Sequence, residues 1–181
     1  VDNFQNITLS AGEVFNPALQ WDQPFATAST TGVGSQNDLD FFIFSEPIFS
    51  FDFLVARSAN SNLFRDPQEL IKFLSPNDDT YYVAIGQYLA AGGPAPSLVK
   101  YIDFSPYTLE KDARAVANGG KLFEYADISS TLIAQPNTAG ALAVGAANWQ
   151  ETPEFGVNPP LPRYFTGLGG TPILFDTAGV R

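Results

Sequence analysis

The chain has 181 residues, of which 45% are hydrophobic and 15% are charged, so it is apolar enough to build a core and too apolar for disorder. It contains no His and no Cys, which excludes a Ser-His-Asp triad, a Cys nucleophile, a zinc finger and an iron–sulfur site within this sequence. Its formal net charge is −10 at pH 7, and such a field repels nucleic-acid phosphates and anionic membrane surfaces.

The first hundred residues predict an antiparallel β-sandwich or jelly roll. Short segments rich in Phe, Tyr, Val and Ile alternate with turn clusters of Gly, Pro, Asn, Asp and Ser, which is typical of sandwiches. Aromatic residues also suit pleated, half-buried surfaces. Pro17 lies inside one of these segments and indicates an edge position or a bulge. The expected strands cover residues 4–9, 13–21, 38–44, 51–57, 69–74, 80–88 and 98–104.

The character of the sequence changes near residue 107. We therefore expect a mainly β protein with a sandwich at residues 1–107 and an irregular, partly β extension at 108–181. The extension has little apolar mass of its own, so it should lean on the sandwich or on a partner. Its expected elements are a helix-like segment at 109–116, a strand at 122–126, a buried strand or short helix at 139–147, an extended proline-rich segment at 151–162 and a last strand at 173–175.

Asp38 and Asp40 are candidate metal ligands. They lie two residues apart on an expected strand, so their carboxylates share one face, and Asn37 lies beside them. Ca²⁺ takes six to eight oxygen ligands, and these residues could contribute some of them. The alternative is a solvent-facing strand end whose negative charges discourage edge pairing. A complete calcium loop is missing from the sequence, and no other cofactor is indicated.

Other patterns are less specific. With 19 Asp and Glu, some carboxylate pair always resembles a glycosidase site. Glycines near residues 167–170 lack the Lys-Ser/Thr of a phosphate loop. Trp21, Trp149 and the Tyr residues could stack on sugars, but such residues more often belong to the core or rim of a sandwich. Asn6-Ile7-Thr8 matches the N-glycosylation pattern, which matters only in a secreted protein.

Several segments in combination resemble segments of the large subtilisin-like serine peptidases that bacteria secrete. The first group resembles their inserted β-sandwich, which is similar to the pre-peptidase C-terminal type of domain, and comprises residues 1–9, 19–25, 37–40 and 94–101. The second group resembles strands of the peptidase core and comprises residues 139–147 and 165–176. In that family the catalytic Asp, His and oxyanion Asn precede such an insert, and the nucleophilic Ser follows the last segment. The sequence departs from the family at residues 135–138, where a Gly-His-Ala-Asn-like stretch is expected.

The resemblance implies a secreted or cell-surface location and protein partners. None of the family's catalytic residues can be carried over to this sequence, so the expected role is non-catalytic binding or structure. The partners would be the remaining peptidase segments or identical subunits, with no nucleic acid and no membrane insertion. Two alternatives stay open: a self-assembling subunit of an extracellular filament or surface layer, and a calcium- or carbohydrate-binding module.

Overall fold

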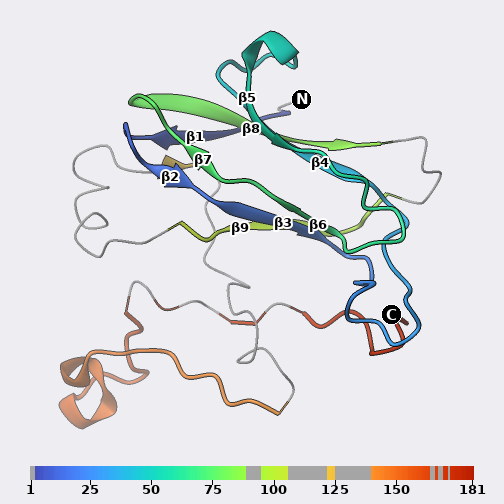
Figure 1. The fold of residues 1–181 in the computed structure, drawn as a ribbon. Coiled ribbons are helices and arrows are strands. Elements are labelled where there is room, and N and C mark those ends of the chain that lie inside the picture. The colour runs from blue at the N-terminus through green and yellow to red at the C-terminus, as the bar shows by residue number, and fades with distance from the viewer. Residues whose placement is uncertain are drawn as a thin grey trace. The chain divides into compact units, whose positions relative to one another are not determined.

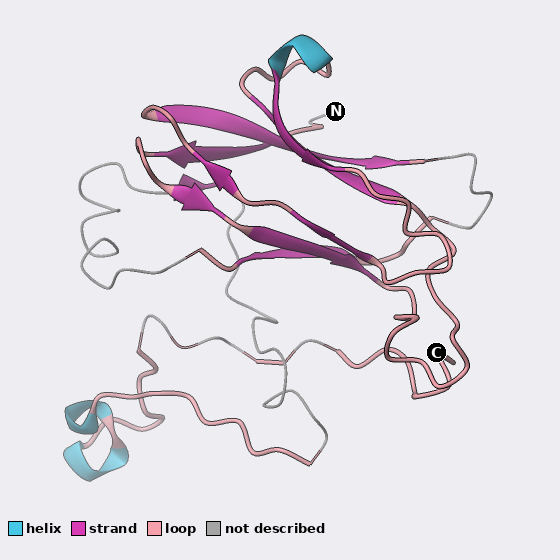
Figure 2. Ribbon diagram, in the orientation of Figure 1, coloured by secondary structure: helices cyan, strands magenta, loops and turns pink. Residues whose placement is uncertain are grey.

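The computed structural model confirms the mainly β fold (Figures 1 and 2). The chain divides into two compact units, Val1–Tyr125 with Leu174–Arg181 and Ala126–Ile173. The predicted boundary at residue 107 and the predicted helix at 109–116 lie outside the described residues. The structure describes residues 3–88, 95–105, 122–124, 140–163, 166, 169–170 and 172–181.

One layer of the first unit is a five-stranded antiparallel sheet. Its strand order is β10-β1-β8-β4-β5, so strands distant in sequence are neighbours, as expected of a sandwich. In this sheet β4 and β8 pair in continuous register, from Leu39 opposite Gln87 to Phe44 opposite Tyr82. The strands are β1 (Gln5–Leu9), β4 (Leu39–Phe44), β5 (Leu54–Ser58), β8 (Asp79–Gln87) and β10 (Leu122–Phe123).

The facing layer consists of a two-stranded and a three-stranded sheet, in the orders β2-β7 and β6-β3-β9 (Figure 1). The expected strand at 13–21 is divided at Asn16, and Pro17 is the first residue of the second piece, a position that suits proline. The edge position expected from Pro17 is wrong, because β3 lies between β6 and β9. The strands are β2 (Val14–Phe15), β3 (Pro17–Trp21), β6 (Gln68–Leu70), β7 (Phe73–Leu74) and β9 (Val99–Asp103).

A single hydrophobic core fills the space between the layers. The strands β1, β3, β4 and β8 each supply alternate residues, because successive side chains of a strand point to opposite faces. Trp21 belongs to this core, and its indole N–H donates to Ser35 Oγ at 3.0 Å. Most polar atoms enclosed in a core have such a partner. The core residues are Ile7, Leu9, Phe15, Leu19, Trp21, Leu39, Phe41, Ile43, Ile71, Phe73, Tyr81 and Val83.

The outer face of the five-stranded sheet is also apolar. Phe42 and Phe44 of β4 are buried there with Ala84 of β8. The connection from β4 to β5 covers them and includes the 3₁₀ turn η1 (Phe51–Phe53). The ring of Phe49 in this connection lies 5.6 Å from Phe42 and 5.1 Å from Phe44. The continuous apolar run of β4 thus reflects burial on both of its faces.

The second unit has little regular structure among its described residues. Two 3₁₀ turns, η4 (Trp149–Glu151) and η5 (Pro153–Phe155), interrupt the segment predicted to be extended. Residues 140–147 form neither a buried strand nor a helix, and within this range only Ala147 makes a bridge, to Pro162. Residues 173–175 form no strand either. These predictions were wrong because a short apolar run becomes a strand only when a partner strand lies beside it.

Residues 174–181 lie against the loop that follows β3. Thr30 N–H donates to Thr177 O at 2.7 Å, and Arg181 pairs with Asp22 at 3.0 Å. The buried Asp22 carboxylate also accepts from Ser97 N–H at 2.9 Å and from Ser97 Oγ at 2.5 Å. Burial by itself raises the pKa of Asp22, but the hydrogen bonds from Ser97 and Leu98 and the charge of Arg181 outweigh it and lower the pKa below its usual value.

Replacing Asp22 should destabilise the first unit more than replacing Arg181. Asp22→Ala removes the buried carboxylate that accepts both Ser97 hydrogen bonds, so we expect a loss of about 2 kcal/mol, whereas Arg181→Ala removes a largely exposed charge and should lose under about 1 kcal/mol. The folded pKa of Asp22 is lowered, so its stabilisation is present above the unfolded pKa and is lost as the pH falls through the folded one. Urea unfolding followed by circular dichroism at several pH values measures both effects. Equal losses in the two variants would contradict this account.

Candidate functional site

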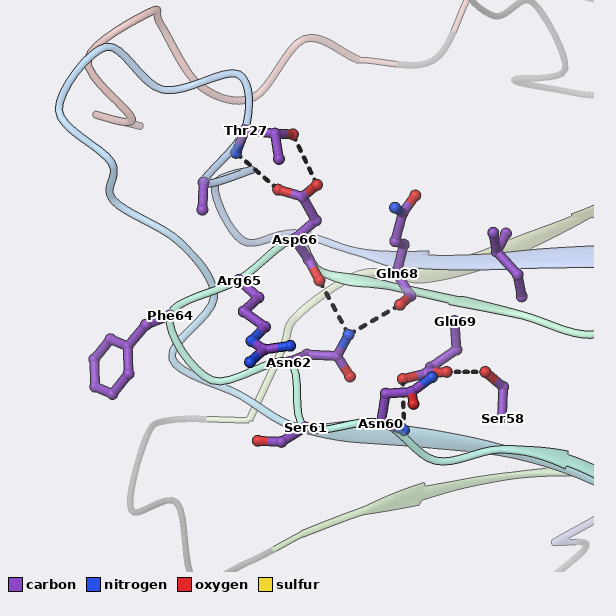
Figure 3. Close-up of a pocket in the computed structure, with 12 residues that line it drawn as sticks. Thr27, Ser58, Asn60, Ser61, Asn62, Phe64, Arg65, Asp66, Gln68 and Glu69 are labelled. Carbon is purple, nitrogen blue, oxygen red and sulfur yellow. Dashed lines mark hydrogen bonds between the residues drawn. The ribbon is translucent and has the colours of Figure 1, made fainter.

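An open pocket of about 450 Å³ lies in the first unit, beside the loop of residues 59–67 that connects β5 to β6 (Figure 3). Its wall is mostly polar side chains, and one exposed aromatic residue stands at its rim. None of its residues was predicted from the sequence to form a site. The side chains that define it are Asn60, Asn62, Phe64, Arg65, Gln68 and Glu69.

Asn62 organises the loop beside the pocket. Its backbone N–H donates to Asp38 Oδ1 at 2.9 Å, which ties the loop to the start of β4. Its side-chain amide donates to the carbonyl oxygens of Asp66 at 3.1 Å and Gln68 at 2.9 Å. Asp66 in turn accepts from Thr27 N–H at 2.9 Å and Thr27 Oγ1 at 2.7 Å. One side of the pocket is therefore held by a chain of hydrogen bonds across four segments.

Glu69 is a buried carboxyl group in the wall of the pocket, only 1% exposed. It accepts hydrogen bonds from Ser58 Oγ and from Asn60 N–H. Burial raises the pKa of Glu69, with a further contribution from the charge of Asp40, and the hydrogen-bond donors around the carboxyl offset this only in part. Asn62 Oδ1 is buried with no hydrogen-bond partner among the described residues, and Figure 3 shows it pointing toward Glu69. A proton on Glu69 would give this oxygen the donor it lacks.

The two candidate metal ligands lie at the start of β4. Asp38 is buried and engaged by the Asn62 N–H. Asp40 is half-buried, and this burial raises its pKa. The negative charge of Asp38 raises the pKa of Asp40 further, whereas the positive charge of Arg57 lowers it. In the part of the chain that the structure describes, no three Asp or Glu side chains are grouped so that they could hold a metal ion. Calcium binding at Asp38 and Asp40 stays a prediction.

The aromatic residues suggested for sugar stacking lie in different surroundings. Trp21 is a core residue, so it offers no face for stacking. Trp149 is exposed in the second unit and packs edge-on against Phe155, with ring centroids 4.7 Å apart. Phe64 was missed, because a Leu-Phe pair in a short polar loop gives no signal of a site in the sequence. Only the backbone conformation and the exposure of Phe64 distinguish it.

Comparison of the chain with protein-family models, with curated proteins and with solved structures gives no match. The resemblance to subtilisin-like peptidases therefore stays a prediction. Over the described residues, no helix has both the length and the apolar character needed to cross a membrane.

Replacing Glu69 by Gln should leave the first unit at least as stable near neutral pH. The introduced amide can place its oxygen at the position of Oε1, where it accepts from Asn60 N–H, and its nitrogen at the position of Oε2, where it donates to Ser58 Oγ, while the cost of burying a negative charge disappears. In the native protein the folded pKa of Glu69 is raised, so the free energy of unfolding falls as the pH rises from the unfolded pKa through the folded one. We expect the variant to lack this fall, an effect of about 1 kcal/mol.

Urea unfolding near neutral pH and at about pH 5 measures this difference. The matched control is Glu46→Gln, because Glu46 is an exposed Glu of the same unit. A large loss of stability in the Glu69 variant near neutral pH would show that the ionised carboxylate is the form that the fold requires.

Proposed function

We propose that this chain is a non-catalytic binding and structural segment of a secreted subtilisin-like serine peptidase. The resemblance of its two halves to the inserted sandwich and the core strands of that family supports the proposal. The sequence also lacks the His on which the catalytic triad of these enzymes depends. The sandwich would act as the folded module, and the second unit would join it to the rest of the enzyme.

The exposure of the second unit carries the proposal. Its described residues include large apolar side chains that remain in water, with Leu142 90%, Val144 83% and Ile173 66% exposed. None of the residues described in this unit is buried. Apolar surface gains about 25 cal/mol for each Å² removed from water, so a partner that covers these side chains would stabilise the unit substantially. The remaining peptidase segments are the partner that the sequence resemblance implies.

A self-assembling subunit is the second candidate, and the outer face of the sandwich favours it. Ile48, Phe49 and Phe51 are exposed in the β4–β5 connection, next to the buried Phe42 and Phe44. An apolar surface of this kind can be covered by an identical subunit. The net charge of −10 opposes such association, most strongly at low ionic strength. This candidate therefore ranks below the first.

Hydrogen exchange, light scattering and a serine-directed probe test the proposal together. In the isolated chain, we expect residues 140–163 to exchange freely while the core strands of the sandwich are protected, and we expect a monomer at all concentrations. A fluorophosphonate probe should not label the chain under conditions in which it labels a commercial subtilisin. Labelling of the chain, or strong protection of residues 140–163 in the monomer, would contradict the proposal. Association that grows with concentration and protects residues 48–51 would favour the self-assembling subunit.

A further inference from the structure

We infer that the pocket beside Phe64 binds a neutral saccharide, with the Phe64 ring as its stacking surface. Such a role is independent of the proposed peptidase origin. The backbone of Phe64 is the first observation, because its φ is 61°, in the left-handed region. Gly and Asn occupy that region readily, whereas a bulky aromatic residue is strained there. Among the described non-glycine residues, Phe64 alone has a positive φ.

The conformation of Phe64 is imposed by its neighbours. Its N–H donates to Ser35 O at 2.7 Å, Ser35 N–H donates to Arg65 O at 2.8 Å, and Arg65 N–H donates to Asn62 O at 2.9 Å. Gly34 makes this close approach possible, since a Cβ there would lie 2.6 Å from the carbonyl carbon of Phe64. The backbone is thus fixed on both sides of the ring. A rigid site loses little conformational freedom when a ligand binds.

The ring of Phe64 contributes almost nothing to the fold. It is 77% exposed and makes no ring contact with any aromatic residue that the structure describes. A Gly would satisfy the backbone without strain at this position, so the fold gives no reason for an aromatic side chain. Strained residues persist where surrounding structure holds them, and they concentrate at binding sites.

The pocket next to Phe64 has the size and chemistry of a saccharide site. Its volume of about 450 Å³ lies within the range of small-molecule sites. Figure 3 shows Phe64 at one edge of the pocket, with its ring directed outward and Arg65 between it and the side chains of Asn60 and Asn62. Asn60, Ser61 and Arg65 are exposed and present amide, hydroxyl and guanidinium groups. A sugar ring has one apolar face for an aromatic ring and hydroxyls for planar polar groups.

A neutral ligand fits better than a charged one. The net charge of −10 disfavours an anion, while Arg65 in the pocket wall disfavours a cation. The wall holds two carboxyl groups: Asp66 already accepts two hydrogen bonds from Thr27, and Glu69 is buried with its pKa raised by burial, which weakens the attraction of both for a cation. Hydroxyl groups can donate and accept, so they suit a wall with both kinds of partner.

The experiment titrates the ¹⁵N-labelled full chain with soluble cello-, xylo-, malto-, chito- and laminari-oligosaccharides and follows the backbone amide signals. We expect at least one of these sugars to shift the signals of residues 60–68 at millimolar concentration. Phe64→Ala should weaken that binding about tenfold or more, because it removes the stacking surface. Phe64→Gly should weaken it equally while leaving the urea midpoint unchanged or higher, since it relieves the strained φ.

Phe51→Ala is the matched control, because Phe51 is 73% exposed and lies outside the pocket wall. It should leave saccharide binding unchanged. Absence of shifts with every sugar of the panel would overturn the inference. Binding that Phe64→Ala leaves intact, or that Phe51→Ala weakens as much, would also overturn it. Destabilisation by Phe64→Gly would show that the fold itself uses the ring, which contradicts the role assigned to the strained φ.

Discussion

Burial of β4 on both of its faces is the constraint on which the first unit depends. Leu39, Phe41 and Ile43 point into the core between the layers, while Phe42 and Phe44 pack beneath the aromatic connection to β5. A slip of this strand by one residue would move Asp40, which shares the outer face with Phe42 and Phe44, into the core between the layers. Its pairing with β8 and β5 is therefore determined, and the rest of the five-stranded sheet is arranged around it.

The same strand positions the pocket. The carboxylate of Asp38, just before β4, accepts the backbone N–H of Asn62, and this bond holds the 59–67 loop against the end of the sheet. From there, the polar contacts of Asn62, Asp66 and Glu69 define one wall. Asp38 at this strand end thus has a structural role, and the alternative considered for it, a solvent-facing strand end that discourages edge pairing, is wrong, because Asp38 is buried and β4 pairs with a strand on each side. An acceptor that holds a loop in place is less free to bind a cation.

The two units differ in how their apolar residues are used. In the sandwich, aromatic and branched residues at alternating positions find partners in the facing layer, and polar atoms such as the Trp21 indole N–H are paired. In the second unit, described residues such as Leu142 and Val144 have no apolar cover. The contrast supports a role in which the first unit is a folded module and the second is completed by another protein surface.

Most of the sandwich could be predicted from local pattern. Alternation and turn residues located the strands around Ile7, Phe41 and Tyr81, because these signals depend only on neighbours in the chain. They did not reveal that the segment at 13–21 is broken at Asn16. The apolar run at 139–147 and the last segment at 173–175 were wrong as regular elements, since a strand exists only when another strand pairs with it. No such partner can be inferred from a short run of small apolar residues.

The sequence by itself determined the mainly β class, the exclusion of histidine and cysteine chemistry and the acidic field, because composition and short-range alternation are sufficient for these. Only the tertiary structure decided that Trp21 is a core residue, that Asp38 holds a loop, and that Glu69 and Phe64 share a pocket wall. Such facts depend on hydrogen bonds between segments distant along the chain, and on a backbone angle imposed by them at Phe64. Contacts of this kind leave no periodic trace in the residues that make them.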